Sequence, residues 1–127
     1  SVDLVRKLRG LGVKTGVVSS SANTKAILSK AGILEQFDTR VDGTTIIEEG
    51  IPGKPAPDTF IEAARRIGFE PSEVVVFEDA IAGVQAGRAG QFGLVVGVDR
   101  VGQTEQLLAN GADVVVSDLS EFEIPTK

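Results

Sequence analysis

The sequence predicts an α/β domain, with a parallel sheet and flanking helices. Short apolar segments alternate with helix-like segments along the chain, as in β-α-β units. The runs Val74–Phe77 and Leu94–Val98 are continuously apolar, which is typical of parallel strands buried on both faces. The 127 residues, of which 42% are hydrophobic, suffice for one compact domain with its own core.

Each predicted element carries its own local signal. Apolar residues at helical spacing mark the helices, and Gly32 and Gly68 are expected to end two of them. Pro57 suits the first position of a helix, because the N–H that it lacks would have no partner there. A short strand near Phe37–Val41 and a turn at Asp42-Gly43 fit the segment that is hardest to interpret. The other predicted elements are, in chain order, a helix over 2–8, a strand Val13–Val18, a helix over 23–31, a helix over 57–67, a strand Val74–Phe77, a small-residue helix Ala80–Ala89, a strand Leu94–Val98, a helix Gln103–Ala109 and a strand Val114–Val116.

The composition excludes several classes of function. The net charge is -5 and there is no basic stripe, which argues against a nucleic-acid partner. No apolar run approaches the ~20 residues that a membrane span needs. Because the chain has no Cys and no His, Ser–His and Cys–His catalysis are impossible within it, and a metal would need hard oxygen ligands. The absence of Cys also fits a reducing compartment, so we expect a cytoplasmic protein.

Polar residues follow the predicted strand Val13–Val18 directly. In open parallel sheets, ligands gather beyond the carboxyl ends of the strands. Ser19, Ser20, Ser21 and Asn23 occupy that position at the start of a helix, where hydroxyl and N–H groups bind anions well. The alternative is an ordinary helix cap, in which one Ser or Asn satisfies backbone donors.

Two further polar groups occupy comparable positions. Lys54 lies in a rigid Gly-Lys-Pro loop ahead of a helix start, where the helix dipole disfavours a cation unless an anion binds with it. Glu78 and Asp79 are adjacent carboxylates at the end of an apolar strand, and a divalent cation would relieve their repulsion and lost solvation. The alternatives are a solvated Lys54, and an Asp79 that caps the next helix beside a solvated Glu78. Taken together, the hydroxyl, ammonium and carboxylate groups describe a phosphate site with a hard metal ion.

Several stretches of the sequence match one known family in order and spacing. They are 17–23 (Val-Val-Ser-Ser-Ser-Ala-Asn), 53–60 (Gly-Lys-Pro-Ala-Pro-Asp-Thr-Phe), 76–87 (Val-Phe-Glu-Asp-Ala-Ile-Ala-Gly-Val-Gln-Ala-Gly), 97–100 (Gly-Val-Asp-Arg) and 111–115 (Gly-Ala-Asp-Val-Val). On these stretches the chain resembles the haloacid dehalogenase-like (HAD) superfamily, in its beta-phosphoglucomutase-like branch. The resemblance covers nearly the whole chain and implies a Rossmann-like core.

The resemblance implies roles for the residues after the first strand. Ser19 would be the hydroxyl that hydrogen-bonds the transferring phosphoryl group, and Ser20 would offer its backbone N–H to the same group. Ser21 and Asn23 match a segment that contacts a second phosphate in beta-phosphoglucomutases. Ala22 departs from the lysine seen in that segment.

The resemblance also assigns the cation and the acids. Lys54 would neutralise the charge of the phosphate and of the nucleophile, so that Ser19 and Lys54 are the expected catalytic residues. Glu78 and Asp79 would be the acids that bind Mg²⁺.

The nucleophile of the family has no counterpart in this sequence. The first motif, Asp-x-Asp-Gly-Thr/Val after an apolar strand, is matched only by Asp42-Gly43-Thr44, which has Arg40 at the nucleophile position and which a turn explains better. We therefore expect residues 1–127 to be a single partial domain, incomplete at its N-terminal central strand, with the nucleophile strand and the cap domain outside the sequence. Such a domain exposes apolar sheet edges, which favour pairing with another chain.

The resemblance implies a Mg²⁺-dependent phosphohydrolase or phosphomutase core that acts on a small phosphorylated metabolite such as a sugar phosphate. The reaction would pass through an aspartyl-phosphate whose Asp lies outside this chain, so we expect the chain by itself to be inactive. The alternative is a non-catalytic phosphate-binding module or partner subunit, which keeps phosphate recognition but has no nucleophile.

Overall fold

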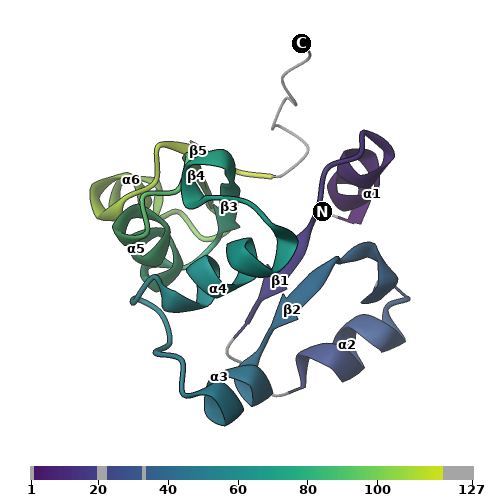
Figure 1. Cartoon of the computed structure of the whole chain (residues 1–127). Coiled ribbons are helices and arrows are strands. Elements are labelled where there is room, and N and C mark those ends of the chain that lie inside the picture. Colours follow the sequence, from purple (N-terminus) through teal and green to yellow (C-terminus); the bar gives the residue numbers. More distant parts are fainter. Residues whose placement is uncertain (1, 20–22, 33, 119–127) are drawn as a thin grey trace.

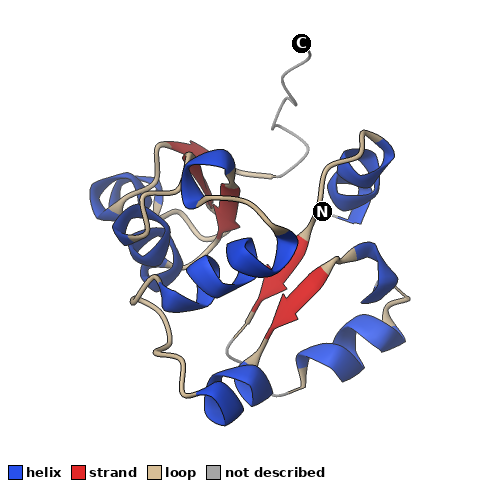
Figure 2. Cartoon of the chain, viewed as in Figure 1, coloured by secondary structure: helices blue, strands red, loops and turns tan. Residues whose placement is uncertain are grey.

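Short parallel strands and the helices that connect them make up the described part of the chain (Figures 1 and 2). The computed structural model describes residues 2–19, 23–32 and 34–118. Its elements are α1 (Val2–Gly10), β1 (Gly16–Val18), α2 (Thr24–Lys30), η1 (Leu34–Gln36), β2 (Thr39–Val41), α3 (Gly43–Glu49), α4 (Asp58–Ile67), η2 (Pro71–Glu73), β3 (Val75–Glu78), α5 (Ile81–Ala89), β4 (Leu94–Val98), α6 (Thr104–Asn110) and β5 (Val114–Val116). The predicted α/β class, with parallel strands and flanking helices, is confirmed.

The strands form two hydrogen-bonded ladders. β1 pairs with β2, while β3, β4 and β5 form a second ladder in that order, and every pair is parallel. Val18 aligns with Val41 in the first ladder, and Glu78 aligns with Gly97 in the second. Because the strands of each ladder are parallel, their carboxyl ends and the loops that follow them lie at one edge of that ladder.

The helices connect the ladders and cover them. α4 contacts both β1 and β2, whereas α5 lies on β3 and β4, and α6 lies on β4 and β5 (Figure 1). None of the helices in the described ranges is both long and apolar enough to cross a bilayer. The packing places the residues just ahead of α4 between the first ladder and the second.

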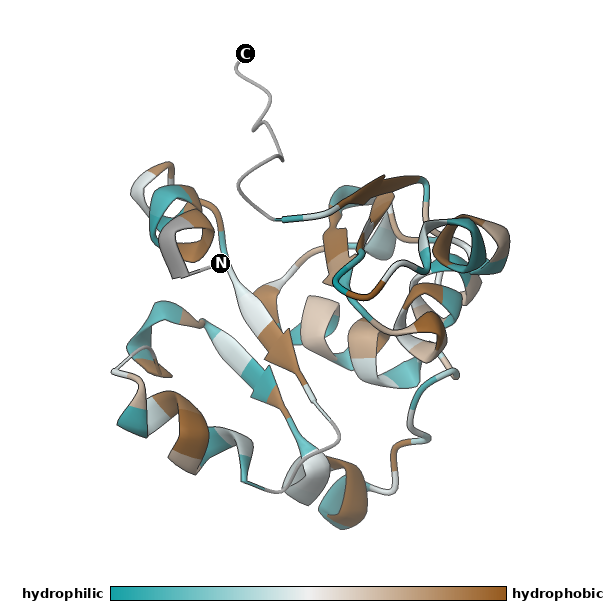
Figure 3. Cartoon of the chain, turned by 180° about the vertical axis from the view of Figure 1, so that it is seen from behind, coloured by the Kyte–Doolittle hydropathy of each residue, from teal (hydrophilic) through white to brown (hydrophobic). Residues whose placement is uncertain are grey.

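A cluster of buried side chains joins the second ladder to the helices. Phe60 and Phe92 meet edge to face within it, with ring centroids 5.9 Å apart, and Val18 of β1 packs against it. Figure 3 shows hydrophobic residues along the strands of this ladder. The buried members of the cluster are Phe60, Ala64, Val76, Val84, Ala86, Phe92, Val95, Leu107 and Ala112. α4 therefore carries core residues only a few positions after the Gly-Lys-Pro loop.

The predicted turn at Asp42-Gly43 is wrong, because Asp42 starts α3 there. The Asp42 carboxylate accepts hydrogen bonds from the Thr45 N–H and hydroxyl, both at 3.1 Å, and from Arg40 Nε at 2.8 Å. Burial acts to raise the pKa of Asp42, but the hydrogen bonds from Thr45 and Arg40 outweigh it and hold the pKa below its usual value. A buried, charged cap of this kind stabilises the start of a helix that the sequence prediction missed.

Two other predictions need correction. The first strand begins at Gly16 and not at Val13, because Thr15 N donates to the Asp38 carboxylate at 2.7 Å ahead of the ladder. The prediction that the third strand is buried on both faces is also only partly correct. Val76 is buried, but Val75 at the start of the strand is 44% exposed.

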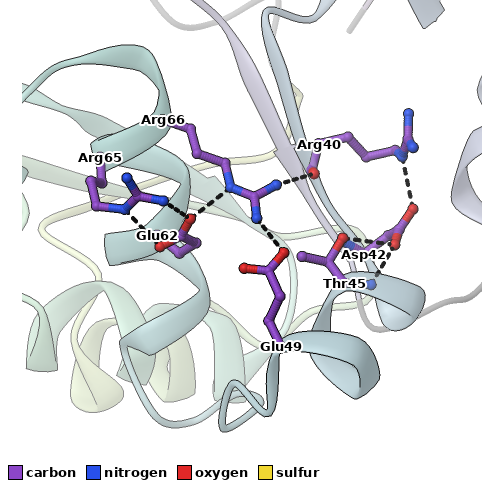
Figure 4. A network of polar contacts seen from close by, with 7 residues as sticks. All are labelled: Arg40, Asp42, Thr45, Glu49, Glu62, Arg65 and Arg66. Carbon is purple, nitrogen blue, oxygen red and sulfur yellow. Dashed lines mark hydrogen bonds and ion pairs between the residues drawn. The ribbon is translucent and has the colours of Figure 1, made fainter.

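An ion-pair network links α3 and α4 to β2 (Figure 4). Arg65 and Arg66 both donate to the Glu62 carboxylate, and Arg66 also reaches Glu49 at 2.6 Å and the carbonyl of Arg40 at 3.4 Å. Hydrogen bonds from Arg65, and then from Arg66, lower the pKa of Glu62 from 4.5 to about 2. The network fixes the orientation of α4 relative to the first ladder.

We expect Glu62→Gln to lower the free energy of unfolding at pH 7 by about 0.5–1 kcal/mol, because it removes the shared anion. The folded-state pKa of Glu62 lies below its unfolded-state value, so its contribution is complete above pH 4.5 and is lost as the pH falls towards about 2. Urea unfolding of both proteins across this range measures the difference, with Glu48→Gln on the exposed face of α3 as the control. A difference that stays constant down to pH 2 would contradict the assignment.

Candidate functional site

Lys54 and Glu78 form an ion pair between the carboxyl ends of the two ladders. Lys54 Nζ donates to a Glu78 oxygen and lies 3.5 Å from the carbonyl oxygen of Val18, the last residue of β1. The same ammonium lies 4.9 Å from the ring centroid of Phe60 on α4. Only 20% of the Lys54 side chain and 10% of the Glu78 side chain are exposed. Both side chains are largely buried and are paired with each other. The alternatives of a solvated Lys54 and a solvated Glu78 are therefore wrong.

The Glu78 side chain rests on a glycine of the helix that follows. A Cβ atom at Gly83 would overlap the Glu78 carboxylate, so the first turn of α5 leaves space for that side chain. The second Glu78 oxygen accepts from the backbone N–H of Ala80 at 3.4 Å. Lys54, Gly83 and Ala80 together hold the carboxylate in one place.

We expect Gly83→Ala to lower the free energy of unfolding by about 1–3 kcal/mol, because the added methyl group displaces the Glu78 carboxylate from Lys54. Chemical denaturation measures the loss. Gly10→Ala is the matched control, since a Cβ there meets nothing within 4 Å. Equal stability of the two variants would show that Glu78 moves aside without cost.

The structure describes two of the four predicted anion-binding residues, Ser19 and Asn23. Ser19 follows β1, is half-buried, and donates its backbone N–H to the Val41 carbonyl at 2.9 Å. It thus lies next along the chain to the Val18 carbonyl that Lys54 approaches. Asn23 is exposed at the start of α2, and its side chain does not cap that helix. Ser20 and Ser21 lie outside the described residues.

Asp79 differs from Glu78 in its surroundings. Its side chain is exposed, and within the described ranges no donor binds its carboxylate. It does not cap α5, whose N-terminal cap is Ala80, so that alternative is wrong as well. Its backbone carbonyl accepts a hydrogen bond from Gln103 Nε2 at 2.9 Å. Asp79 therefore presents a free carboxylate from a backbone that is held in place.

The loop after β4 holds Gln103 through an aspartate. Asp99 Oδ1 accepts from the backbone N–H groups of Val101, Gly102 and Gln103 at 3.1, 2.7 and 2.9 Å. The other Asp99 oxygen accepts from the Thr104 hydroxyl. The hydrogen bonds from Thr104 and then from the Gln103 N–H lower the pKa of Asp99 to about 2. The loop is thus braced by a carboxylate that stays ionised at neutral pH.

The residues at these strand ends fit a hard divalent cation as part of its ligand set. Glu78 and Asp79 supply carboxylate oxygens, the donors that Mg²⁺ prefers. One Glu78 oxygen is occupied by Lys54, which leaves Asp79 as the more available ligand. The part of the chain that the structure describes contains no group of three or more acidic side chains that could hold a metal by themselves. A complete metal site needs further ligands from water, from the substrate or from another segment.

Gln103, Asp99 and Gly83 support the residues of this site, although the sequence alone assigned none of them a role there. Gln103 acts on a residue 24 positions away, so no local pattern marks it. Asp99, in contrast, had a readable signal, because an Asp followed by Gly102 and Thr104 is typical of a side chain that binds nearby backbone donors.

The fold and the residues at the carboxyl ends of its strands define a class of protein: an α/β domain with a cation and two adjacent acids at the ends of parallel strands. Residues 1–91 match the model of the haloacid dehalogenase-like hydrolase family. The chain belongs to this family, and its likeness to the beta-phosphoglucomutase branch is confirmed.

Relatives and solved structures agree with this assignment. Over 116 residues the chain is 55% identical to a beta-phosphoglucomutase of Mycobacterium bovis, covering 89% of this chain and 44% of the relative. Over 91 residues it is 42% identical to the fructose-1-phosphate phosphatase YqaB of Escherichia coli, covering 69% and 45% of the two chains. The crystal structure of a beta-phosphoglucomutase from Clostridium difficile superposes with a TM-score of 0.81 at 27% identity, covering 95% of this chain and 50% of that one. This chain thus spans about half the length of the proteins that it matches.

Proposed function

We propose that this chain supplies the phosphate and metal side of the active site in a Mg²⁺-dependent phosphohydrolase or phosphomutase. The observation that carries the proposal is the position of Lys54. Its ammonium lies between the carboxyl ends of β1 and β3, half a nanometre or less from Val18, Glu78 and Phe60. A largely buried ammonium group at the carboxyl ends of these strands is suited to bind a phosphate dianion, because phosphoryl transfer requires mainly that charge be neutralised.

The residues of this chain would divide the work of binding and orienting a phosphate. The Ser19 hydroxyl donates to a phosphoryl oxygen, with Ser20, Ser21 and Asn23 extending the anion site. Lys54 faces the same oxygens and offsets the charge that moves onto them as the bond to the leaving group lengthens. Its ion pair with Glu78 fixes the ammonium before the substrate arrives, so no reorganisation is needed during the reaction.

Glu78 and Asp79 would hold Mg²⁺, which when bound neutralises part of the charge on the phosphate. Asp79 is the direct ligand in this proposal, because its carboxylate has no donor within the described ranges. Glu78 contributes through its position beside Lys54 and can share the cation through a water molecule.

The nucleophile in this proposal is an aspartate from a strand outside residues 1–127. Within the described ranges β1 and β3 do not pair with each other, although Lys54 contacts the end of each. An apolar parallel strand that pairs with both would bring its own carboxyl end to Lys54. The carboxylate of this aspartate attacks phosphorus and the bond from phosphorus to the substrate oxygen breaks. The leaving oxygen takes its proton from the second aspartate of the Asp-x-Asp motif on the same strand. The strand comes from another segment of the same polypeptide or from a second chain.

The names of the relatives support one class of substrate. One of them is named as a phosphoglucomutase, one as a fructose-1-phosphate phosphatase and a third, from Mycobacterium leprae, as a trehalose-phosphate phosphatase. We therefore propose a small sugar phosphate as the substrate and the cytoplasm, where such metabolites are found, as the location. A phosphatase and a mutase differ only in whether water or a second substrate hydroxyl accepts the phosphoryl group.

The test is phosphate release, or interconversion of isomers, from a panel of hexose and disaccharide phosphates by the intact protein. We expect turnover with Mg²⁺ and its loss in EDTA, restored when Mg²⁺ is added back. Binding of inorganic phosphate without turnover of any sugar phosphate would favour the alternative, a non-catalytic phosphate-binding module. Turnover that is unaffected by EDTA would contradict the metal assignment.

A further inference from the structure

The peptide unit that follows Asp79 is held from both sides. Its carbonyl oxygen accepts from Gln103 Nε2 at 2.9 Å, and its N–H, that of Ala80, donates to Glu78 Oε2 at 3.4 Å. Fixing the plane of this peptide unit fixes the backbone of Asp79 on its carboxyl side. The direction in which the exposed Asp79 side chain leaves the backbone is thereby restricted.

The Gln103 side chain donates its hydrogen bond to Asp79, although Gln103 occupies the position at which a side chain often caps a helix. Gln103 is the N-terminal cap residue of α6, and its side chain makes no capping hydrogen bond. Asp99 performs that task instead, since it accepts from the backbone N–H of Gln103 and from the Thr104 hydroxyl. The loop between β4 and α6 therefore needs nothing from the Gln103 amide, which is left to contact the loop between β3 and α5.

We infer that Gln103 is a positioning residue for Asp79, with Asp99 as the brace that holds Gln103 in place. Asp79 lies at the carboxyl end of β3, and Asp99 lies at the carboxyl end of the neighbouring β4. The two loops meet through the single hydrogen bond from Gln103 to the Asp79 carbonyl, as far as the described residues go. A metal ligand on a loop gains affinity when its backbone is ordered before the metal arrives, because less conformational freedom is lost on binding.

This inference rests on the proposed function, because it takes Asp79 as a Mg²⁺ ligand. Its test measures Mg²⁺ binding without turnover, by calorimetric titration of the intact protein with MgCl₂ in the absence of substrate. Gln103→Leu keeps the size of the side chain and removes the donor. We expect the dissociation constant for Mg²⁺ to rise about threefold to tenfold, the usual worth of one such hydrogen bond.

Gln106→Leu is the matched control, because Gln106 lies on the same helix and is exposed. We expect it to leave the Mg²⁺ affinity unchanged. Asp99→Asn should also weaken Mg²⁺ binding. The double variant should bind Mg²⁺ no more weakly than the single variant with the lower Mg²⁺ affinity. That non-additivity distinguishes positioning through one hydrogen bond from two independent losses of stability.

The outcomes separate this inference from the proposed function. A wild-type protein that does not bind Mg²⁺ overturns both. A wild-type protein that binds Mg²⁺, with Gln103→Leu binding it equally well, overturns the inference and leaves the function standing. If Gln103→Leu lowers the melting temperature without metal and does not change the Mg²⁺ affinity, the residue is structural only. Gln103→Met, which also removes the amide donor and adds no charge, gives a second independent variant that should weaken Mg²⁺ binding to a similar extent.

Discussion

Lys54→Met is expected to lower kcat/KM for sugar-phosphate turnover by about 10²- to 10³-fold. The substitution keeps an unbranched side chain over Phe60 and removes the charge that lies between Val18 and Glu78. Loss of a preorganised donor at a developing negative charge has an effect of this size. Steady-state kinetics with Mg²⁺ measure it, and most of the loss should lie in kcat, because the charge to be offset grows in the transition state.

The same substitution has a cost in stability. It leaves the Glu78 carboxylate, whose side chain is 10% exposed, without its cation, which should lower the free energy of unfolding by about 1–3 kcal/mol. Lys30→Met on the exposed surface of α2 is the control and should change neither quantity. Lys54→Arg keeps the charge but not the shape, and partial recovery of activity is expected from it. A Lys54→Met enzyme within threefold of wild type would exclude Lys54 from the reaction.

Asp79→Asn is expected to weaken Mg²⁺ binding more than tenfold and to reduce turnover by about 10²-fold or more. Asparagine has the same shape, so the hydrogen bonds of the backbone to Gln103 and Glu78 are kept while the charge is lost. Raising the Mg²⁺ concentration should restore part of the activity, as expected for a ligand. Thermal stability without metal should stay near that of the wild type, because the Asp79 side chain is exposed.

Asp58→Asn is the matched control for this prediction, since Asp58 is another exposed aspartate next to a loop. Its Mg²⁺ affinity should equal that of the wild type. If Asp79→Asn bound Mg²⁺ as tightly as the control, the metal would have to be assigned to other residues.

The sequence predicted the elements with strong periodicity well and the capped helix poorly. The strand Leu94–Val98 was predicted at its observed bounds, because a run of apolar residues buried on both faces is hard to mistake. α3 was missed, because Asp42-Gly43 is a frequent turn pair. The decisive contacts, a buried Asp42 bonded to Thr45 and Arg40, become visible only when β2 has placed Arg40 beside them.

The site could be predicted as a set of residues but not as a set of contacts. Lys54 and Glu78 were each expected at this edge, and their direct ion pair depends on where α4 carries the Gly-Lys-Pro loop. Gln103 could not have been predicted, because its contact with Asp79 joins two loops that only the pairing of β3 with β4 brings together. Residues that bind a ligand tend to follow strands, whereas residues that orient them can come from any loop nearby.

The ion pair between Lys54 and Glu78 bears on the order in which ligands arrive. With its charge already balanced by Glu78, Lys54 offers a phosphate dianion less attraction than a lone ammonium would, and Asp79 adds repulsion. A divalent cation reverses that balance. We therefore expect each ligand to raise the affinity for the other by an equal factor, as thermodynamic linkage requires. At low Mg²⁺ the protein would then hold neither ligand firmly, and the concentration of free metal in the cell would set how much sugar phosphate is bound.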